Sequence, residues 1–415
     1  MKKILLFILL FIAINTVISA KVTEICTNEN FSEGCIYKGI GYLLGTSVKQ
    51  DFPKAIELFT KACQLKYVLG CSLLGSNYYS GEFLKQDYDK YIEFTTKACK
   101  YGDGSDCFHL AEEYKTGEKI KQDYNESLYL YSKACDLNNS DGCYMLGLLY
   151  DEGKTIEKDM QKAKEFYTKA CDLNNSKGCL YLGYMSIRES NTTQSLLQSE
   201  KYFTKACILN DAEGCLNAGL LFIDESALPI DFKKSENFFT KACDGDMSDA
   251  CFRLGLMNEN GNGIKNNYKK AFGFYKQACK SNDMRACYNL ASLYNRGKGV
   301  KQDYKMSQQY YEITDKNSFY QGTFALGMMY MSGKGTVKDY SKAEKLFEKS
   351  CNNGYLKSCN NLAVIYANGI GQDIDYNKAY KLFNKACDGG LEEACKTAKV
   401  MQGTNNSDVN KTKKK

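Results

Sequence analysis

Pairs of cysteines recur along this 415-residue chain in a fixed register. The first cysteines of successive pairs lie 36 residues apart, with one step of 72, and each second cysteine follows its partner by eight positions. A constant period over most of a chain is typical of a repeat array rather than of two or three separate globular domains. The first members are Cys63, Cys99, Cys135, Cys171, Cys207, Cys243, Cys279, Cys351 and Cys387, and the second members are Cys71, Cys107, Cys143, Cys179, Cys215, Cys251, Cys287, Cys359 and Cys395.

One register position lacks both cysteines, because Asp315 and Thr323 stand where the next pair is expected. Joint loss is what a bonded pair predicts, since a single remaining member would be a free thiol. Local bridges between the two cysteines of each pair are therefore favoured over the other possible connectivities. Cys26 and Cys35, nine residues apart and outside the register, are expected to form one more bridge near the N-terminal end.

The eight-residue separation also constrains the backbone. Residues i and i+8 of one straight helix lie about 12 Å apart, whereas a disulfide requires Cα atoms within roughly 4.4–6.8 Å. The chain must therefore turn between the two cysteines, and segments such as residues 136–142 have the polar residues and glycine that suit a turn and a helix N-cap. Each bridge is predicted to close the corner between two helices.

The remainder of each period reads as two helices. Residues 144–150 are apolar and precede Gly153, a candidate C-cap, and Asp159 can cap a second helix over residues 160–170. Leucine recurs three positions after the second cysteine, and glycine or alanine recurs one position later, which predicts close packing of neighbouring helices. Tyrosine recurs seven positions after the second cysteine, which favours packing between helices. The expected fold is all-α, a right-handed α/α solenoid of about ten disulfide-linked hairpins and a final half-repeat.

The N-terminus has the three parts of a secretory signal peptide. Lys2 and Lys3 precede an apolar stretch over residues 4–18, and Ser19-Ala20 offers a cleavage site. We expect residues 1–20 to be removed, residues 21–400 to form the solenoid, and residues 401–415 to be a disordered basic tail. The alternative is a membrane anchor, for which the stretch is short. The protein is thus predicted to be secreted or periplasmic, with no stable membrane anchor, in a compartment where disulfides form.

Composition excludes several classes of function. The chain has one histidine, His109, and no pair of cysteines spaced as C-x-x-C, so neither a metal site nor any other cofactor is expected. The formal charge of +6 comes largely from lysines near the two ends. The repeats therefore offer no basic stripe for nucleic acid, and no nucleic-acid partner is expected.

Residues 325–343 closely resemble the Sel-one-like repeat (SLR), a relative of the tetratricopeptide repeat. The recurring Lys-Ala-Cys with a second cysteine eight positions on, behind a signal peptide, resembles the secreted Helicobacter cysteine-rich protein family over residues 22–400. This resemblance implies binding of β-lactams or of cell-wall peptides, and slow β-lactamase (hydrolase) activity of the kind that underlies antibiotic resistance.

The chain carries little of the machinery known for that chemistry. The repeats contain neither Ser-x-x-Lys nor Ser-Asp-Asn. Lys115-Thr116-Gly117 spells the third element of the serine enzymes, but it lies where most repeats end their first helix with glycine. No catalytic residue can be assigned from the sequence.

A second interpretation is a non-enzymatic scaffold that binds an extended peptide or protein in its concave groove, and a third is a secreted protein that acts on host cells. The first helix of each hairpin lines the concave face in repeats of this superfamily. On this helix, the residues two and nine positions after the second cysteine vary from repeat to repeat. Together they form a predicted ladder, whose side chains could hydrogen-bond a peptide backbone or a carboxylate. The alternative is a solvated face without a ligand. The candidate binding residues of this ladder are His109, Asn217, Arg253, Asn289, Arg296 and Asn361.

Overall fold

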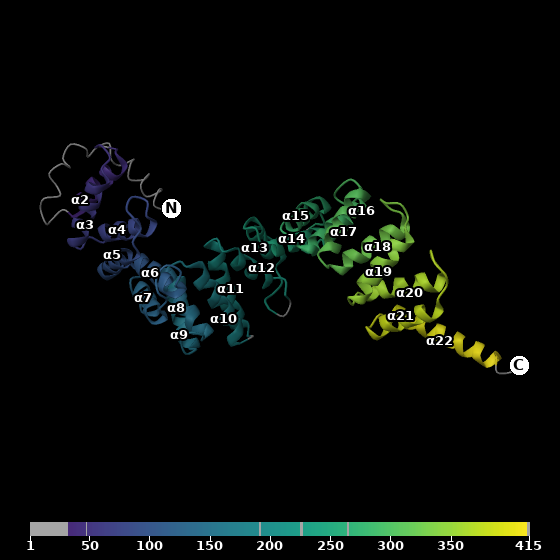
Figure 1. Cartoon of the computed structure of the whole chain (residues 1–415). Coiled ribbons are helices and arrows are strands. Elements are labelled where there is room, and N and C mark those ends of the chain that lie inside the picture. The colour runs from purple at the N-terminus through teal and green to yellow at the C-terminus, as the bar shows by residue number, and fades with distance from the viewer. Residues whose placement is uncertain (1–31, 47, 191, 225–226, 264, 413–415) are drawn as a thin grey trace. The chain divides into compact units, whose positions relative to one another are not determined.

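The computed structural model describes residues 32–46, 48–190, 192–224, 227–263 and 265–412. Within these ranges every element of regular secondary structure is a helix, and within each compact unit described below the helices follow one another as antiparallel neighbours (Figure 1). The chain divides into two compact units, the first ending at Asn191 and the second beginning at Thr192. In each hairpin the helix that begins beside a second cysteine is called the A helix, and the helix that carries the next first cysteine is called the B helix.

The first unit begins with the A helix α2 and ends with the A helix α10, so that A and B helices alternate. Sequence neighbours pack against each other throughout this unit. The A helices are α2 (Ser32–Leu44), α4 (Val68–Ser80), α6 (Gly104–Thr116), α8 (Ser140–Glu152) and α10 (Ser176–Glu189), and the B helices are α3 (Phe52–Gln64), α5 (Tyr88–Tyr101), α7 (Tyr124–Asp136) and α9 (Met160–Asp172).

The second unit continues the same alternation and ends on the A helix α22 (Glu392–Thr412). The order of helices along the two units confirms the predicted all-α fold of about ten hairpins and a final half-repeat. The other A helices are α12 (Ala212–Leu220), α14 (Ser248–Asn260), α16 (Met284–Arg296), α18 (Tyr320–Ser332) and α20 (Leu356–Asn368), and the B helices are α11 (Thr193–Ile208), α13 (Phe232–Asp244), α15 (Tyr268–Lys280), α17 (Tyr304–Lys316), α19 (Tyr340–Asn352) and α21 (Tyr376–Asp388).

Wherever the register has its cysteines, a disulfide joins the end of a B helix to the start of the next A helix, as predicted. The bridges bring Cα atoms eight positions apart to within 4.5–4.8 Å of each other. The pairs are Cys63–Cys71, Cys99–Cys107, Cys135–Cys143, Cys171–Cys179, Cys207–Cys215, Cys243–Cys251, Cys279–Cys287, Cys351–Cys359 and Cys387–Cys395. Cys26 lies outside the described residues, so its pairing with Cys35 stays a prediction.

A left-handed residue shapes every one of these corners. The third position after the first cysteine has positive φ in each repeat, for example 61° at Asn138. Asparagine tolerates this conformation better than most residues. The next residue, Asn139, donates its N–H back to the carbonyl of Ala134 at 2.9 Å. Its side chain then caps α8 by accepting from the N–H of Gly142 at 2.8 Å, so one short segment ends one helix and begins the next.

The small and apolar residues that recur in the sequence form the interior of each hairpin. Leu146 and its equivalents are buried. A Cβ added at Gly147 would lie 2.5 Å from the ring of Tyr167 on the facing B helix, which explains why a larger residue is not accepted there. Tyr150 stacks on Phe166 with ring centroids 5.7 Å apart, so the recurring tyrosine also packs the A helix against its B helix, as predicted.

The position without cysteines keeps the same corner by hydrogen bonding. Thr323 Oγ1 donates to Asp315 Oδ1 at 2.7 Å, which joins the two places that a disulfide occupies in the other repeats. Lys349 Nζ also contacts Asp315 Oδ1 at 2.7 Å. A hydrogen bond thus replaces the covalent link between α17 and α18.

We predict that the double substitution Asp315→Cys/Thr323→Cys forms a further disulfide in the oxidised protein. In the chain-entropy estimate, closing so short a loop stabilises by about 2.5 kcal/mol, which exceeds the roughly 1 kcal/mol contributed by the lost hydrogen bond. Peptide mapping without reductant should show the new bridge, and the thermal midpoint should rise by several degrees. Thr323→Cys alone is the control, with one alkylatable thiol and a lower midpoint. Two alkylated thiols in the double variant would contradict the prediction.

The ends of the chain bear on the other expectations. The predicted signal peptide, residues 1–20, lies outside the described residues. The helix α22 runs to Thr412, and the predicted boundaries at residues 21, 400 and 415 stay predictions. None of the helices within the described ranges is long and apolar enough to cross a membrane.

Candidate functional site

The A helices of successive repeats contact each other in the first unit. Polar pairs 34 residues apart link them. Ser72 of α4 donates to Asp106 of α6, and the amide of Asn175 donates to Asp141 of α8 at 2.8 Å. Many polar groups on this side of the hairpins are therefore committed to holding neighbouring A helices together. We call this side the A-helix face.

All six residues of the predicted ladder lie on A helices, but several are engaged within the protein. Arg253 pairs with Asp249 at 2.7 Å on α14, and Arg296 of α16 lies 3.6 Å from Glu259. His109 is exposed on α6 with its ring edge toward Phe108. The amides of the remaining residues also bond inside the chain: Asn217 to the carbonyl of Glu213, Asn361 to Met328 Sδ, and Asn289 to Tyr275. The ladder stays a prediction as a binding surface.

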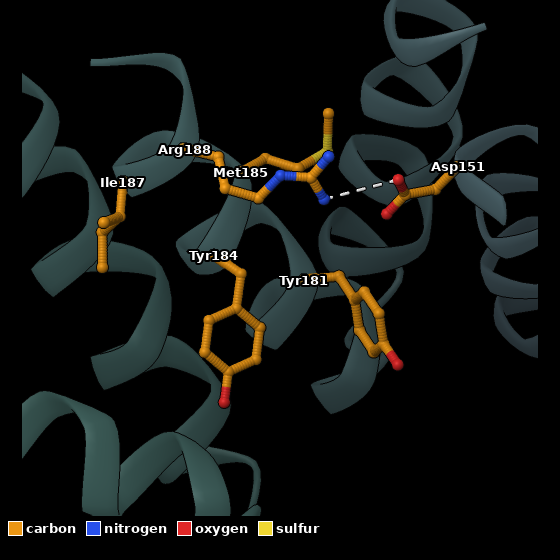
Figure 2. Close-up of a pocket in the computed structure, with 6 residues that line it drawn as sticks. All are labelled: Asp151, Tyr181, Tyr184, Met185, Ile187 and Arg188. Carbon is orange, nitrogen blue, oxygen red and sulfur yellow. Dashed lines mark hydrogen bonds and ion pairs between the residues drawn. The ribbon is translucent and has the colours of Figure 1, made fainter. Parts of the chain in front are cut away.

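A cavity of about 330 Å³ opens on the A-helix face between α8 and α10. Its surface is largely apolar. The rings of Tyr181 and Tyr184 are perpendicular, with centroids 6.3 Å apart, and both lie on the same side of the pair formed by Arg188 and Asp151 (Figure 2). We call it the Tyr184 cavity, and its lining residues are Asp151, Tyr181, Tyr184, Met185, Ile187 and Arg188.

A second cavity of about 270 Å³ lies among α6, α8 and the N-terminal end of α10. We call it the Tyr144 cavity. Lys177 Nζ lies 5.9 Å from the centroid of the Tyr144 ring, and Glu112 accepts from the Tyr131 hydroxyl and from Lys115. This cavity is more polar than the first, and its lining residues are Phe108, Glu112, Asp141, Tyr144, Met145, Asn175, Ser176 and Lys177.

The two cavities adjoin through a pair of aromatic rings. Tyr144 lines one cavity, Tyr181 lines the other, and their ring centroids are 5.7 Å apart. Behind them the buried ring of Tyr167 lies 5.2 Å from that of Tyr181. The cavities therefore form two neighbouring depressions over one aromatic floor that a single ligand could span.

The described residues offer binding chemistry rather than an evident catalytic group. Burial raises the pKa of Asp106 to about 6, against the opposing hydrogen bond from Ser72, but this carboxylate lines neither cavity. Within Lys115-Thr116-Gly117, Gly117 is the left-handed C-cap of α6, and Lys115 pairs with Glu112 at 3.1 Å. Lys115-Thr116-Gly117 therefore forms the C-terminal end of α6. The described residues contain no group of three or more His, Cys, Asp or Glu that could hold a metal ion.

One buried hydroxyl beside the Tyr184 cavity is unsatisfied. Tyr167 is fully buried, and its hydroxyl has no hydrogen-bond partner among the residues that the structure describes. Burial and then the nearby Asp151 carboxylate raise its pKa. In the second unit the equivalent tyrosine, Tyr275, donates to Glu259 at 2.8 Å. Asp151 occupies the same register position as Glu259, eight after the second cysteine, but is one methylene shorter.

We predict opposite effects of the same substitution at the two tyrosines. Tyr275→Phe removes a hydrogen bond to a charged group, worth about 1.5–3 kcal/mol, so its thermal midpoint should fall by several degrees. Tyr167→Phe removes a buried hydroxyl that bonds nothing, so its midpoint should stay the same or rise. Thermal unfolding followed by circular dichroism gives both values. An equal loss in the two variants would show that Tyr167 has a partner.

Sequence reasoning reached only part of the site. The predicted ladder positions include Met145, Tyr181 and Arg188, which line the cavities, whereas none of the six named candidates does. The interpretation missed Tyr184 and Asp151. The available signal was periodicity, because the fifth position after the second cysteine lies on the same helix face as the second and the ninth. It is tyrosine in one repeat and glutamate in another, a variability that core positions lack.

Comparison with known proteins agrees with the architecture. A family model described as Sel1 repeat matches residues 37–67, 68–103, 105–139, 140–175, 176–211, 248–283, 285–313, 321–355 and 356–391. No match was found among the curated proteins.

Several solved structures resemble the chain. A protective antigen present in uropathogenic Escherichia coli strains, which displays an SLR fold, is 23% identical, with a TM-score of 0.62 over 90% of this chain and 88% of that one. A Sel1 repeat protein from Oxalobacter formigenes is 23% identical, with a TM-score of 0.57 over 75% of this chain and 91% of that one. Helicobacter pylori cysteine rich protein B is 36% identical over 32% of this chain and 97% of its own, with a TM-score of 0.26.

Proposed function

We propose that this chain, which belongs to the Sel1 repeat family, is a binding scaffold that holds an extended segment of a partner protein on the A-helix face of its first unit. The observation that carries the proposal is the pair of adjoining cavities over the Tyr144–Tyr181 ring pair. Repeat arrays commonly bind partners along the face formed by equivalent helices.

The dimensions of the two cavities suit a peptide. Volumes of about 330 and 270 Å³ are near the lower end of ligand pockets, so each is suited to one side chain rather than to a large ligand. Alternate side chains of an extended chain lie on one face, about 6.6 Å apart, so adjoining cavities could each receive one of them. Tyrosine and methionine in the lining provide apolar contact area that adapts to different side chains.

The compartment follows from the same disulfides. Nine bridges within the described residues are compatible with an oxidising environment and unusual in a reducing one. We therefore place the partner outside the reducing cytosol, in a periplasm or outside the cell, including a host surface. Cell-wall peptides belong to the same class of extended ligands and are covered by the same test.

We predict that displayed random 12-residue peptides selected on the oxidised full chain bind at these cavities. Tyr184→Ala and Met145→Ala should each weaken the selected peptides about tenfold, because each removes an aromatic or apolar contact from a lining wall. Binding is measured by fluorescence anisotropy with labelled synthetic peptides.

The matched control is Tyr129→Ala, which removes a 57% exposed tyrosine from the B helix α7 of the same unit. It should leave affinity unchanged, and circular dichroism should show equal helicity in all three variants. A failure to select any peptide, or peptides that respond equally to Tyr129→Ala, would refute the proposal. The predicted ladder is tested in the same way with Asn217→Ala, Asn289→Ala and Asn361→Ala.

Hydrolysis of β-lactams, implied by the resemblance to cysteine-rich relatives, gains no support from the residues described. Lys115 and Gly117 serve the end of α6, and the 18 cysteines of the nine bridges are bonded in pairs. Binding or slow turnover of β-lactams stays a prediction from the resemblance.

A chromogenic cephalosporin tests that prediction directly. We expect the oxidised protein at micromolar concentration to show no turnover above buffer, because the run that matches the serine enzymes, Lys115-Thr116-Gly117, forms the end of α6. Lys115→Ala is the informative variant. Turnover that disappears with this substitution would reinstate the enzymatic interpretation and assign the lysine to it.

A further inference from the structure

We propose that the Tyr184 cavity receives a lysine or arginine side chain of the bound peptide, in the place now held by the guanidinium of Arg188. This inference rests on the proposed function and adds the chemical class of the ligand. It follows from the groups that surround Asp151.

The Asp151 carboxylate is poorly neutralised for its position. Its side chain is only 13% exposed, yet its ion pairs are long, at 3.5 Å to Arg188 and 3.9 Å to Lys158. A nearly buried carboxylate gains most from a close, charge-assisted hydrogen bond. An incoming ammonium or guanidinium could approach it more closely than either present partner does.

Arg188 is held loosely enough to be replaced. Its side chain is 55% exposed, and within the described part of the chain its other polar contact is with Met160 Sδ at 3.9 Å. In Figure 2 it reaches across the top of the cavity toward Asp151, while the tyrosine rings lie below the pair. It therefore acts as an internal cation that occupies the place of a ligand.

The other groups at the cavity also favour a cation. The perpendicular rings of Tyr181 and Tyr184 can present their faces to a cation from two directions. Both α8 and α10 end here, at Glu152 and Glu189. The carbonyl ends of helices carry partial negative charge, which attracts a cation.

The charge of the wider surface is complementary to a basic segment. The A helices α6, α8 and α10 carry seven carboxylates and three cations, whereas α12, α14, α16, α18 and α20 of the second unit carry three carboxylates and four cations. In the first set the carboxylates are Asp106, Glu112, Glu113, Asp141, Asp151, Glu152 and Glu189, and the cations are Lys115, Lys177 and Arg188. A basic segment is therefore attracted to the face of the first unit in particular.

The second unit contains an equivalent carboxylate, arginine and tyrosine, but there the carboxylate is bonded within the protein. Glu259 and Arg296 stand at the register positions of Asp151 and Arg188, and Glu259 also accepts from Tyr275. The longer glutamate side chain brings its carboxylate to the tyrosine hydroxyl of the same unit. With aspartate in its place, Asp151 leaves Tyr167 without a partner and faces the cavity.

The test exploits the opposite signs of two substitutions. The probe is the best peptide selected by display on the oxidised full chain, together with versions in which its basic residue is replaced by glutamine or glutamate. We expect lysine or arginine to be enriched in the selected pool, and the glutamine version to bind about tenfold more weakly. Arg188→Gln should tighten the basic peptide several-fold by removing the internal competitor, whereas Asp151→Asn should weaken it about tenfold.

Matched variants complete the design. Lys97→Gln removes a partly exposed cation, ion-paired with Glu93, from the B helix α5 of the same unit and should leave affinity unchanged. Asp151→Glu keeps the charge but reaches Tyr167, as Glu259 reaches Tyr275, and should weaken the peptide. Circular dichroism on every variant separates loss of binding from loss of fold.

The remaining outcomes are decisive as well. Enrichment of acidic peptides, with Arg188→Gln abolishing binding, would overturn the inference and make Arg188 an anion-binding residue. Peptides that respond to Tyr184→Ala but show no charge preference would overturn the inference and leave the proposed function standing. Absence of any peptide that responds to Tyr184→Ala would overturn both.

Discussion

The disulfide between residues i and i+8 is the constraint on which each repeat depends. It forces the chain to reverse within seven residues, and the left-handed residue and the N-cap that follow serve the same reversal. Because the bridge fixes where each A helix begins, equivalent A helices are held next to one another with matching register. The hydrogen bond between Thr323 and Asp315 shows that the geometry of this corner is retained even where the covalent bond is absent.

Within each A helix, some positions pack the interior of the hairpin and other positions are free to vary from repeat to repeat. The third and fourth positions after the second cysteine pack against the B helix and accept only leucine and small residues, as Leu146 and Gly147 illustrate. The second, fifth and ninth positions face away from that interior. Their side chains can change from repeat to repeat without cost to the hairpin, and this is where binding specificity can be encoded.

The features that could be predicted from the sequence are those that depend on the spacing of residues within a single repeat. The hairpins, the bridges, the packing of Gly147 and the stacking of Tyr150 each follow from spacing within about 36 residues. The cavities were not predictable in this way, because each depends on side chains from successive A helices. Asp151 and Arg188, or Tyr144 and Tyr181, form a site only after neighbouring repeats have packed together, and the lengths of the side chains decide whether a gap remains. For polar residues such as Arg253, the partner within the protein, here Asp249, could not be identified without coordinates.

The comparison of Asp151 with Glu259 shows how small a change can create a site in such a scaffold. Both carboxylates stand at the same register position, each opposite a buried tyrosine and an arginine of the next repeat. Glutamate reaches the tyrosine hydroxyl and completes an internal network. Aspartate falls short, so a buried hydroxyl loses its acceptor and the carboxylate turns to a long contact with an exposed arginine. An unsatisfied buried hydroxyl costs about 1–3 kcal/mol, and the disulfide at each corner supplies stability that lets the repeat carry that cost. The disulfides thereby allow the repeat to keep an unsatisfied buried hydroxyl. The same short aspartate that leaves the hydroxyl unsatisfied keeps its carboxylate available to a ligand.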